Sequence, residues 1–199
     1  GQMNQAAQIE LIIVIELIPG EIEAWQPREH LTVSQWGEKN YVVTEGEWKG
    51  ELLNLDQTPF LRYPMDAWGR PGLKVLIIVG PNQGGKSLIM YVCWAYGQHQ
   101  RNATALMVLA DEKLAGEVAS ERLAKIIRKS PALKKITTGS PMDLGQKKVK
   151  LLSSLTRMGW PRSEATMQAF SYLEVYEDEM RLYAWDGKVM DPIAQGVAR

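Results

Sequence analysis

Cysteine and histidine are scarce in this sequence, which has a single cysteine and two histidines among its 199 residues. One cysteine excludes an internal disulfide framework, and two histidines argue against a zinc cluster. Both counts are typical of a reducing, intracellular setting. We expect Cys93 to be a small buried apolar residue, which is the usual role of an unpaired cysteine.

An excess of charge of one sign is also absent, because 23 lysine and arginine residues balance 23 aspartate and glutamate residues. No overall positive field draws the chain onto nucleic acid or a membrane, so any contact with a polyanion must be local. The longest apolar run, LIIVIELI at residues 11–18, is far shorter than the ~20 residues of a membrane span. It also lacks the basic start and the cleavage site of a secretory signal. The run predicts a helix or a strand of an N-terminal arm, and its local pattern leaves both open.

With 45% hydrophobic residues the chain can form one globular core. Two apolar runs, LKVLIIV at 73–79 and TALMVLA at 104–110, predict strands buried on both faces of a sheet. A helical pattern follows each run, at 86–96 until Gly97 and at 112–129 until Pro131. This alternation predicts an α/β fold with a parallel sheet flanked by helices. Further patterns predict strands at 147–152 and 172–176, a short helix capped by Ser163, and an N-terminal arm, residues 1–57, packed on a core of residues 58–199.

The segment GPNQGGKS lies between the first apolar run and its helix, and it matches the phosphate-loop pattern G-x-x-x-x-G-K-S. Phosphate oxygens must come close to successive backbone N–H groups, and residues without a Cβ let a loop curl that tightly. Lys86 is expected to reach the β- and γ-phosphates of ATP and Ser87 to bind Mg²⁺, while the start of the helix adds its positive dipole end. The alternative is a glycine-rich turn with a chance lysine. The expected nucleotide-contacting residues of the loop are Gly80, Pro81, Asn82, Gln83, Gly84, Gly85, Lys86 and Ser87.

A phosphate loop of this kind needs an acidic partner for Mg²⁺ and, for hydrolysis, a glutamate beside the attacking water. Two acidic pairs follow predicted strands, Asp111-Glu112 and Asp178-Glu179. The first follows the cleaner apolar strand, whereas Glu174 and Glu177 interrupt the second. Topology favours Asp178-Glu179, because in P-loop ATPases with a catalytic glutamate the acidic strand lies beside the strand that precedes the loop. The strand reached by the first crossover usually lies further out. The alternative for either pair is an acidic helix start favoured by the helix dipole.

Blocks around the phosphate loop resemble the large terminase subunit of tailed phages, in its lambda-like branch. They are LTVSQWGEKNYVV, EGEW and TPFLRYPMDAW before the loop, and ASERLAKIIRKSPALKK, EDEM and DPIAQGVAR after it, so the resemblance spans about residues 31–199. Each block is weak alone, but their order and spacing around the loop are specific. The resemblance implies a P-loop NTPase fold of the RecA-like type.

The resemblance further implies a motor that hydrolyses ATP to drive double-stranded DNA into an empty procapsid. Such a motor works as a homo-oligomeric ring on the portal protein, with a small terminase subunit, in the cytoplasm of an infected bacterium; an isolated domain can be monomeric. Asp178 would hold Mg²⁺, and Lys86 and Glu179 would be the catalytic residues. The block DQTPFLR matches the one near the adenine in such motors, which makes Gln57, Phe60 and Arg62 candidates for base contact.

The chain departs from the family pattern in two further ways. Many terminases carry an arginine inside the phosphate loop, where this sequence has PNQ. A charge-stabilising arginine must therefore come from elsewhere in the chain or from a neighbouring subunit. The coupling motif and the metal-dependent nuclease domain of large terminases do not appear before Arg199, so no nuclease activity is expected of these residues.

Two rival functions stay open. The loop also resembles that of mismatch-repair ATPases of the MutS kind, although their acidic block is absent here, and a helicase-like or other nucleic-acid-linked P-loop ATPase belongs to the same alternative. A domain that binds nucleotide without turnover would instead serve as an assembly module. Basic clusters offer candidate DNA contacts, although their acidic neighbours also allow an ordinary solvated face. The basic residues are Arg122, Lys125, Arg128, Lys129, Lys134, Lys135, Lys147, Lys148 and Lys150.

Overall fold

The computed structural model describes residues 28–161, 163 and 170–178. The chain divides into two compact units, Gly1–His30 and Leu31–Arg199, and the architecture below is that of the second. Three sequence predictions lie outside the described residues: the element at 11–18, the body of the helix after Ser163, and the placement of Glu179.

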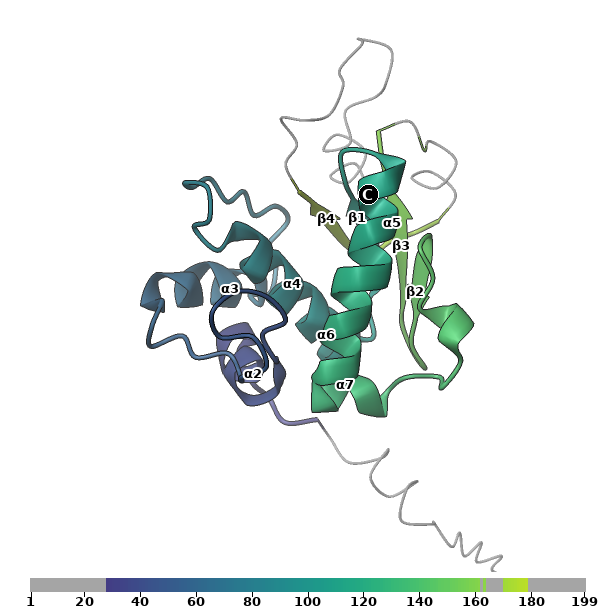
Figure 1. Cartoon of the computed structure of the whole chain (residues 1–199). Helices are drawn as coiled ribbons and strands as arrows, with labels where there is room; N and C mark the ends of the chain where they lie inside the picture. The colour runs from purple at the N-terminus through teal and green to yellow at the C-terminus, as the bar shows by residue number, and fades with distance from the viewer. Residues whose placement is uncertain (1–27, 162, 164–169, 179–199) are drawn as a thin grey trace, which may run out of the picture. The chain divides into compact units, whose positions relative to one another are not determined.

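A mixed sheet organises the second unit. Its strands in the part of the chain that the structure describes are β1 (Thr104–Val108), β2 (Lys148–Lys150), β3 (Leu155–Gly159) and β4 (Glu174–Glu177), in the order β2-β3-β1-β4 (Figure 1). Strand β1 runs parallel to both β3 and β4, whereas β2 is antiparallel to β3. The α/β prediction is confirmed. The prediction of a parallel sheet is wrong at β2, because a tight turn with Leu151 N donating to Ser154 O folds β2 and β3 into a hairpin.

Helices occupy much of the remaining described chain. The phosphate-loop helix α4 begins at Lys86, as predicted, and the pattern at 112–129 becomes one nearly continuous helical column that stops before Pro131. In Figure 1 this column stands in front of the strands, and α2, α3 and α4 lie beside it. The helical segments are α2 (Val33–Asn40), η1 (Pro59–Leu61), α3 (Arg62–Trp68), α4 (Lys86–Tyr96), η2 (Gly97–Arg101), α5 (Glu112–Glu117), η3 (Val118–Leu123), α6 (Ala124–Lys129), α7 (Pro131–Lys135) and η4 (Pro141–Asp143).

The α-helix α4 ends at Tyr96, before Gly97, as predicted, but Gly97 does not end the helical path of the chain. Its backbone is helical, with φ −58° and ψ −44°, and the chain continues through the wide turn of η2. A Cβ at Gly97 would overlap the Glu174 carboxylate of β4. Gly97 is therefore required by close packing of helix against strand rather than by a left-handed helix end.

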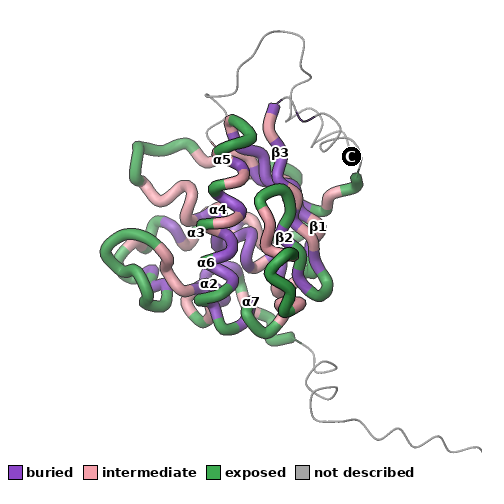
Figure 2. Tube along the Cα trace, turned by 45° about the vertical axis from the view of Figure 1, so that its right-hand side comes forward, coloured by how far each residue is buried: buried purple, intermediate pink, exposed green. Residues whose placement is uncertain are grey.

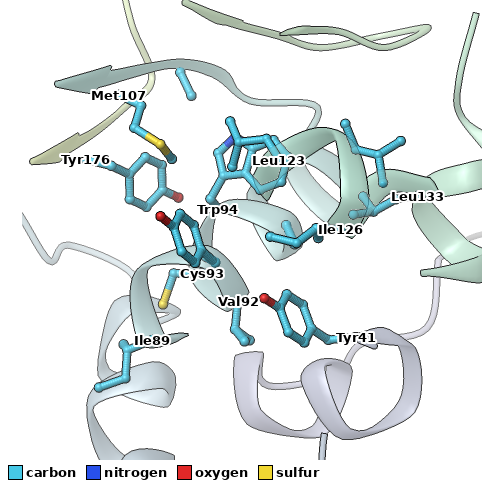
Figure 3. Packing of buried hydrophobic residues seen from close by; sticks show 14 of the residues in the cluster. Tyr41, Ile89, Val92, Cys93, Trp94, Met107, Leu123, Ile126, Leu133 and Tyr176 are labelled. Carbon is cyan, nitrogen blue, oxygen red and sulfur yellow. The ribbon is translucent and has the colours of Figure 1, made fainter. Parts of the chain in front are cut away.

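One face of the sheet carries the main core. Met107 and Tyr176 point from β1 and β4 toward Trp94 of α4 and toward Leu123 and Ile126 of the helical column (Figure 3). Trp94 Nε1 donates a hydrogen bond of 2.8 Å to Thr156 Oγ1 of β3, which satisfies both buried polar groups. Cys93 is buried on α4, as predicted. Figure 2 shows the same pattern, with buried residues concentrated along α4, α6 and the strands.

The predicted strand at 73–79 is wrong in the structure. No residue from 73 to 80 lies in a strand, and the side chains of Ile77 and Val79 are 72% and 91% exposed. Only Leu76 and Ile78 are partly buried. An apolar run of this length forms a buried strand only if other strands pair with it, and among the described residues the sheet ends at β4. The apolar composition of residues 73–79 shows that their side chains could be buried, but it does not show which strand would pair with them.

Candidate functional site

The phosphate loop turns sharply into α4 through residues with positive φ. Gln83 has φ 58° and Gly85 has φ 81°. A Cβ on Gly85 would lie 3.0 Å from Leu61 Cδ2, and one on Gly84 would lie 3.0 Å from Pro81 O, so these two positions are tight as predicted. Gly80 has nothing within 4 Å of an added Cβ. The folded loop itself therefore does not require a glycine at position 80.

The N-terminus of α4 is open to an anion. Gly85 occupies the N-cap position and supplies no side-chain hydrogen bond, so the first backbone N–H groups of α4 are not capped by it. Uncapped N–H groups together with the helix dipole favour negative charge at this point. Lys86 adds its ammonium group, which donates to Gly80 O at 3.0 Å and to Pro81 O at 2.6 Å. The loop thus holds its lysine against its own carbonyl groups.

Asp178 meets the first turn of α4. Ser87 Oγ donates to Asp178 Oδ2 at 3.2 Å, and Asp178 N donates to Val108 O at 3.2 Å, which extends the pairing of β4 with β1 by one residue. Side chains alternate along a strand, so Asp178 shares the core-facing side of β4 with Glu174 and Tyr176. That alternation explains why this carboxylate, following a polar strand, reaches the phosphate loop.

The other acidic pair has structural partners of its own. Asp111 is the N-cap of α5, where its side chain accepts a hydrogen bond of 2.8 Å from Leu114 N. Glu112 forms an exposed ion pair of 3.2 Å with Lys147. These contacts fit the expectation of an acidic helix start.

The oxygens of Ser87 and Asp178 suit Mg²⁺. This ion takes oxygen ligands and is usually bound through one or two carboxylates together with substrate phosphates. Within the described ranges no group of three or more histidine, cysteine, aspartate or glutamate side chains is arranged to hold a metal ion. One hydroxyl and one carboxylate beside an anion site fit Mg²⁺ that arrives with a nucleotide better than a permanent metal centre.

A cavity of about 370 Å³ opens beside the loop. Its volume is in the range of small-molecule sites. Four loop residues line it, namely Gln83, Gly84, Gly85 and Ser87, together with Gln57 and Phe60, two of the three residues predicted to contact the base. Phe60 is 65% exposed, so its ring is accessible to a ligand. Gly80, Pro81, Asn82 and Lys86 do not line this cavity.

Arg62, the third predicted base contact, is engaged elsewhere. Its guanidinium forms two hydrogen bonds to the Glu38 carboxylate, at 2.7 and 2.8 Å, and a further one of 2.7 Å to Asp56. Hydrogen bonding to Glu38 and Asp56 raises the pKa of Arg62. The side chain joins α2 to the segment before η1, and it is not among the residues that line the cavity.

Tyr91 and Arg122 are among the lining residues of this cavity that sequence reasoning did not assign to the site. Arg122 Nη1 donates to Tyr91 Oη at 3.2 Å, and Arg122 Nε lies 3.5 Å from Glu45 Oε1. Burial raises the pKa of the Tyr91 phenol, so this group stays neutral. Tyr91 was detectable, since it lies four residues after Ser87 on the same helix face. In the sequence Arg122 belonged to a basic cluster read either as a candidate DNA contact or as a solvated face, and nothing in the pattern linked it to the loop.

The buried Glu174 explains the polar character of β4. It is 4% exposed, accepts a hydrogen bond of 2.6 Å from Tyr176 Oη, and pairs with Arg101 Nη1 at 3.1 Å. Burial raises the pKa of Glu174 above its ordinary value, and the two hydrogen bonds oppose that rise. The carboxylate that interrupts the apolar pattern is thus a satisfied internal group.

The fold and the site together define an α/β protein in which part of a phosphate-loop motif lines a cavity of about 370 Å³. Residues 45–190 match the family of the phage terminase large subunit gpA, ATPase domain, and the chain belongs to this family. The resemblance drawn from the sequence is confirmed. Neither the curated proteins nor the solved structures contain a match to this chain. None of the helices among the described residues has the length and apolar character needed to cross a membrane.

Proposed function

We propose that this domain binds ATP with Mg²⁺ at the N-terminus of α4 and hydrolyses it. In this mechanism the N–H groups of the loop and the Lys86 ammonium bind the terminal phosphates, and Lys86 neutralises the charge that gathers on the γ-phosphate. Ser87 and Asp178 would hold Mg²⁺, which screens the phosphate charges when it is bound. Glu179 orients the attacking water. The observation that carries the proposal is the contact between Ser87 Oγ and Asp178 Oδ2, because Ser87 also lines the cavity.

We propose the P-loop NTPase fold for the same reasons. The motif lies directly before a helix that begins at its lysine, and the acidic residue follows a strand parallel to its neighbour β1. Phe60 and Gln57 are proposed to contact the base, since they line the cavity that the loop opens into. An adenine ring against the exposed face of Phe60 would be held by stacking.

Family membership supports the wider role. We propose that ATP hydrolysis by this domain powers the movement of double-stranded DNA into a procapsid in the cytoplasm of an infected bacterium. The partners would be the portal protein, the small terminase subunit and further copies of this chain in a ring. Lys125, Arg128 and Lys129 are exposed at one end of the helical column, and they are proposed DNA-phosphate contacts whose binding would weaken with salt.

The decisive experiment compares nucleotide binding and phosphate release for the unaltered chain, Lys86→Ala and Glu179→Gln. Lys86→Ala is expected to lose both binding and release, because its charge is needed by the bound phosphates. Glu179→Gln is expected to keep binding and to lose release by about 100-fold or more, since a base near the reacting water contributes on that order. Lys74→Ala is the matched control, because Lys74 is an exposed lysine before the loop.

Two outcomes would overturn this proposal. Undiminished phosphate release from either variant would reject the role of that residue. Nucleotide binding without release by the unaltered chain, even when it is concentrated or mixed with double-stranded DNA, would make the domain an assembly module instead of an ATPase.

A further inference from the structure

We infer that Arg122 is a phosphate-contacting residue of this nucleotide site, supplied by the same chain, and that Glu45 holds it until a nucleotide arrives. The inference rests on the proposed function and deepens it. It assigns to Arg122 a place in the site instead of a place on a DNA-binding face.

The position of Arg122 is the first step. Its side chain lines the same cavity as Gly84, Gly85 and Ser87, and its guanidinium is hydrogen-bonded to Tyr91, one helical turn after Ser87. Asp178 is close enough to interact electrostatically with both Tyr91 and Arg122. The guanidinium therefore lies in the wall of the cavity that the start of α4 also lines, within electrostatic range of the Asp178 carboxylate.

The wide turn η3 sets Arg122 apart from the other basic residues of its column. In a regular helix Arg122, Lys125 and Lys129 share one face, since they are spaced by three and seven positions. Residues Val118–Leu123 instead form a π-helical segment, in which each turn contains more residues than an α-helical turn and later side chains are rotated relative to earlier ones. Arg122 ends in the cavity wall while Lys125 and Lys129 are exposed. Single π-helical turns of this kind occur frequently at functional sites.

The contacts of Arg122 are of the kind that a phosphate can replace. Its ion pair with Glu45 measures 3.5 Å between partly exposed groups, with side chains 41% and 56% exposed. Exposed pairs of this kind add little to stability, so the guanidinium can leave Glu45 at small cost. The planar fork of an arginine matches phosphate oxygens, and such charged hydrogen bonds are stronger than neutral ones. Tyr91 would hold Nη1 while the remaining donors turn toward the phosphates.

The phosphate loop has few cationic side chains, so a bound phosphate group would need further positive charge from elsewhere in the site. The loop supplies one cationic side chain, Lys86, because the residues between Gly80 and Gly84 are Pro81, Asn82 and Gln83. A triphosphate carries several negative charges that need compensation when it is taken from water. Among the residues that line the cavity, Arg122 is the single cationic side chain, and it faces the charge of three lining glutamates, Glu45, Glu47 and Glu51. An anion in this cavity therefore depends on Arg122 for a balancing charge from the wall.

The test measures equilibrium affinity of the full chain for MgATP, MgADP and inorganic tripolyphosphate. Arg122→Ala is expected to weaken MgATP and tripolyphosphate binding by about 10-fold to 100-fold, which is the effect of losing a charged hydrogen bond. Arg122→Lys should recover part of the affinity, since it restores the charge without the fork. Glu45→Gln should bind equally well or more tightly, because the guanidinium is released. Lys113→Ala, which removes an exposed charge from the same column, is the matched control and should bind as the unaltered chain does.

The outcomes separate this inference from the function on which it rests. If Lys86→Ala loses nucleotide and Arg122→Ala does not, Arg122 has no phosphate role and the proposed function stands. If Arg122→Ala keeps nucleotide affinity but weakens salt-sensitive binding of double-stranded DNA as much as Arg128→Ala does, Arg122 belongs to a DNA surface and the inference is overturned. If the unaltered chain binds none of the three ligands, the proposed function itself fails. The thermal unfolding midpoints of Arg122→Ala and Arg122→Lys should equal that of the unaltered chain. Equal midpoints show that a loss of affinity does not come from a loss of folding.

Discussion

Ser87 and Asp178 stand 91 positions apart in the chain, and their side chains meet at 3.2 Å. The contact joins the first turn of α4 to the residue that follows β4, so the end of the strand lies beside the start of the helix. A hydroxyl and a carboxylate are oxygen groups of the kind that the proposed Mg²⁺ would bind together with phosphate oxygens.

Asp178→Asn is expected to abolish the dependence of ATP binding on Mg²⁺. In the unaltered chain, removal of Mg²⁺ with a chelator should weaken ATP binding by about 10-fold or more, on the scale of one charged contact. The asparagine variant should bind ATP equally weakly with and without the ion, because the amide lacks the charge that attracts it. Titration of a fluorescent ATP analogue measures this. Asp111→Asn is the control, since asparagine also caps helices and should leave both stability and Mg²⁺ dependence unchanged.

Gly85→Ala and Gly46→Ala separate backbone strain from steric overlap. The two glycines have nearly the same φ, 81° and 82°, but only at Gly85 does an added Cβ meet another atom, Leu61 Cδ2 at 3.0 Å. Gly46→Ala should lower the free energy of unfolding by about 1 kcal/mol, the cost of a left-handed conformation. Gly85→Ala should cost more than this and should also weaken nucleotide binding. Denaturant unfolding measures the first effect, and equal losses in the two variants would contradict the packing described at Gly85.

Phe60→Ala is expected to weaken ATP binding and to leave inorganic tripolyphosphate binding unchanged. The ring lines the cavity and is exposed, whereas the phosphates are proposed to lie at the start of α4. Loss of stacking on an aromatic side chain costs on the order of 1–3 kcal/mol for a base. Calorimetric titration with both ligands checks this. Tyr63→Ala is a suitable control, because Tyr63 is 69% exposed and does not line the cavity. An equal loss of tripolyphosphate binding in Phe60→Ala would show that the ring supports the loop and not the base.

Glu174→Gln is expected to make the free energy of unfolding less dependent on pH. In the unaltered chain this free energy should fall as the pH rises. Burial raises the pKa of Glu174 in the folded chain above its ordinary value of 4.5, so the folded state keeps its proton after the unfolded chain has lost it. Because the folded state then binds more protons, its stability falls as the pH rises from about 4.5 through the raised pKa. Each unit of raised pKa corresponds to about 1.4 kcal/mol. Urea unfolding of both proteins between pH 4 and 8 measures the difference, and parallel curves would contradict the raised pKa.

The sequence predicted the elements whose local signals agree with their packing. The helix at 86–96 starts where a left-handed glycine frees its first N–H groups, and the column at 112–129 stops where Pro131 forces its predecessor Ser130 into an extended conformation. Strand β1 was visible because its apolar run is buried between two neighbours. Strand β3 was missed, since Arg157 and two serines before it break the apolar pattern, although β3 pairs directly with β1.

The site was predictable as a motif but not as a set of neighbours. Spacing alone identified Ser87, and topological reasoning about P-loop ATPases led to Asp178, which the structure places in contact with it. The same reasoning did not place Arg122 in the cavity wall, because its position depends on the wide helical turn η3, which the sequence pattern does not predict. Arg62 was expected near the base from its motif position, and in the structure Glu38 and Asp56 bind its guanidinium. Long-range contacts of this kind are decided by the folded chain as a whole.

Helix α4 and strand β4 are fastened together twice, by Ser87 with Asp178 at one end and by the close approach of Gly97 to Glu174 at the other. Arg101 extends the second fastening, since it binds Glu174 and also donates to Gly69 O at 3.1 Å, shortly before the chain enters the phosphate loop. These contacts connect both ends of α4 to β4 and, through Arg101, to Gly69. A displacement of β4 along α4 would therefore have to break contacts at both ends of the helix at once.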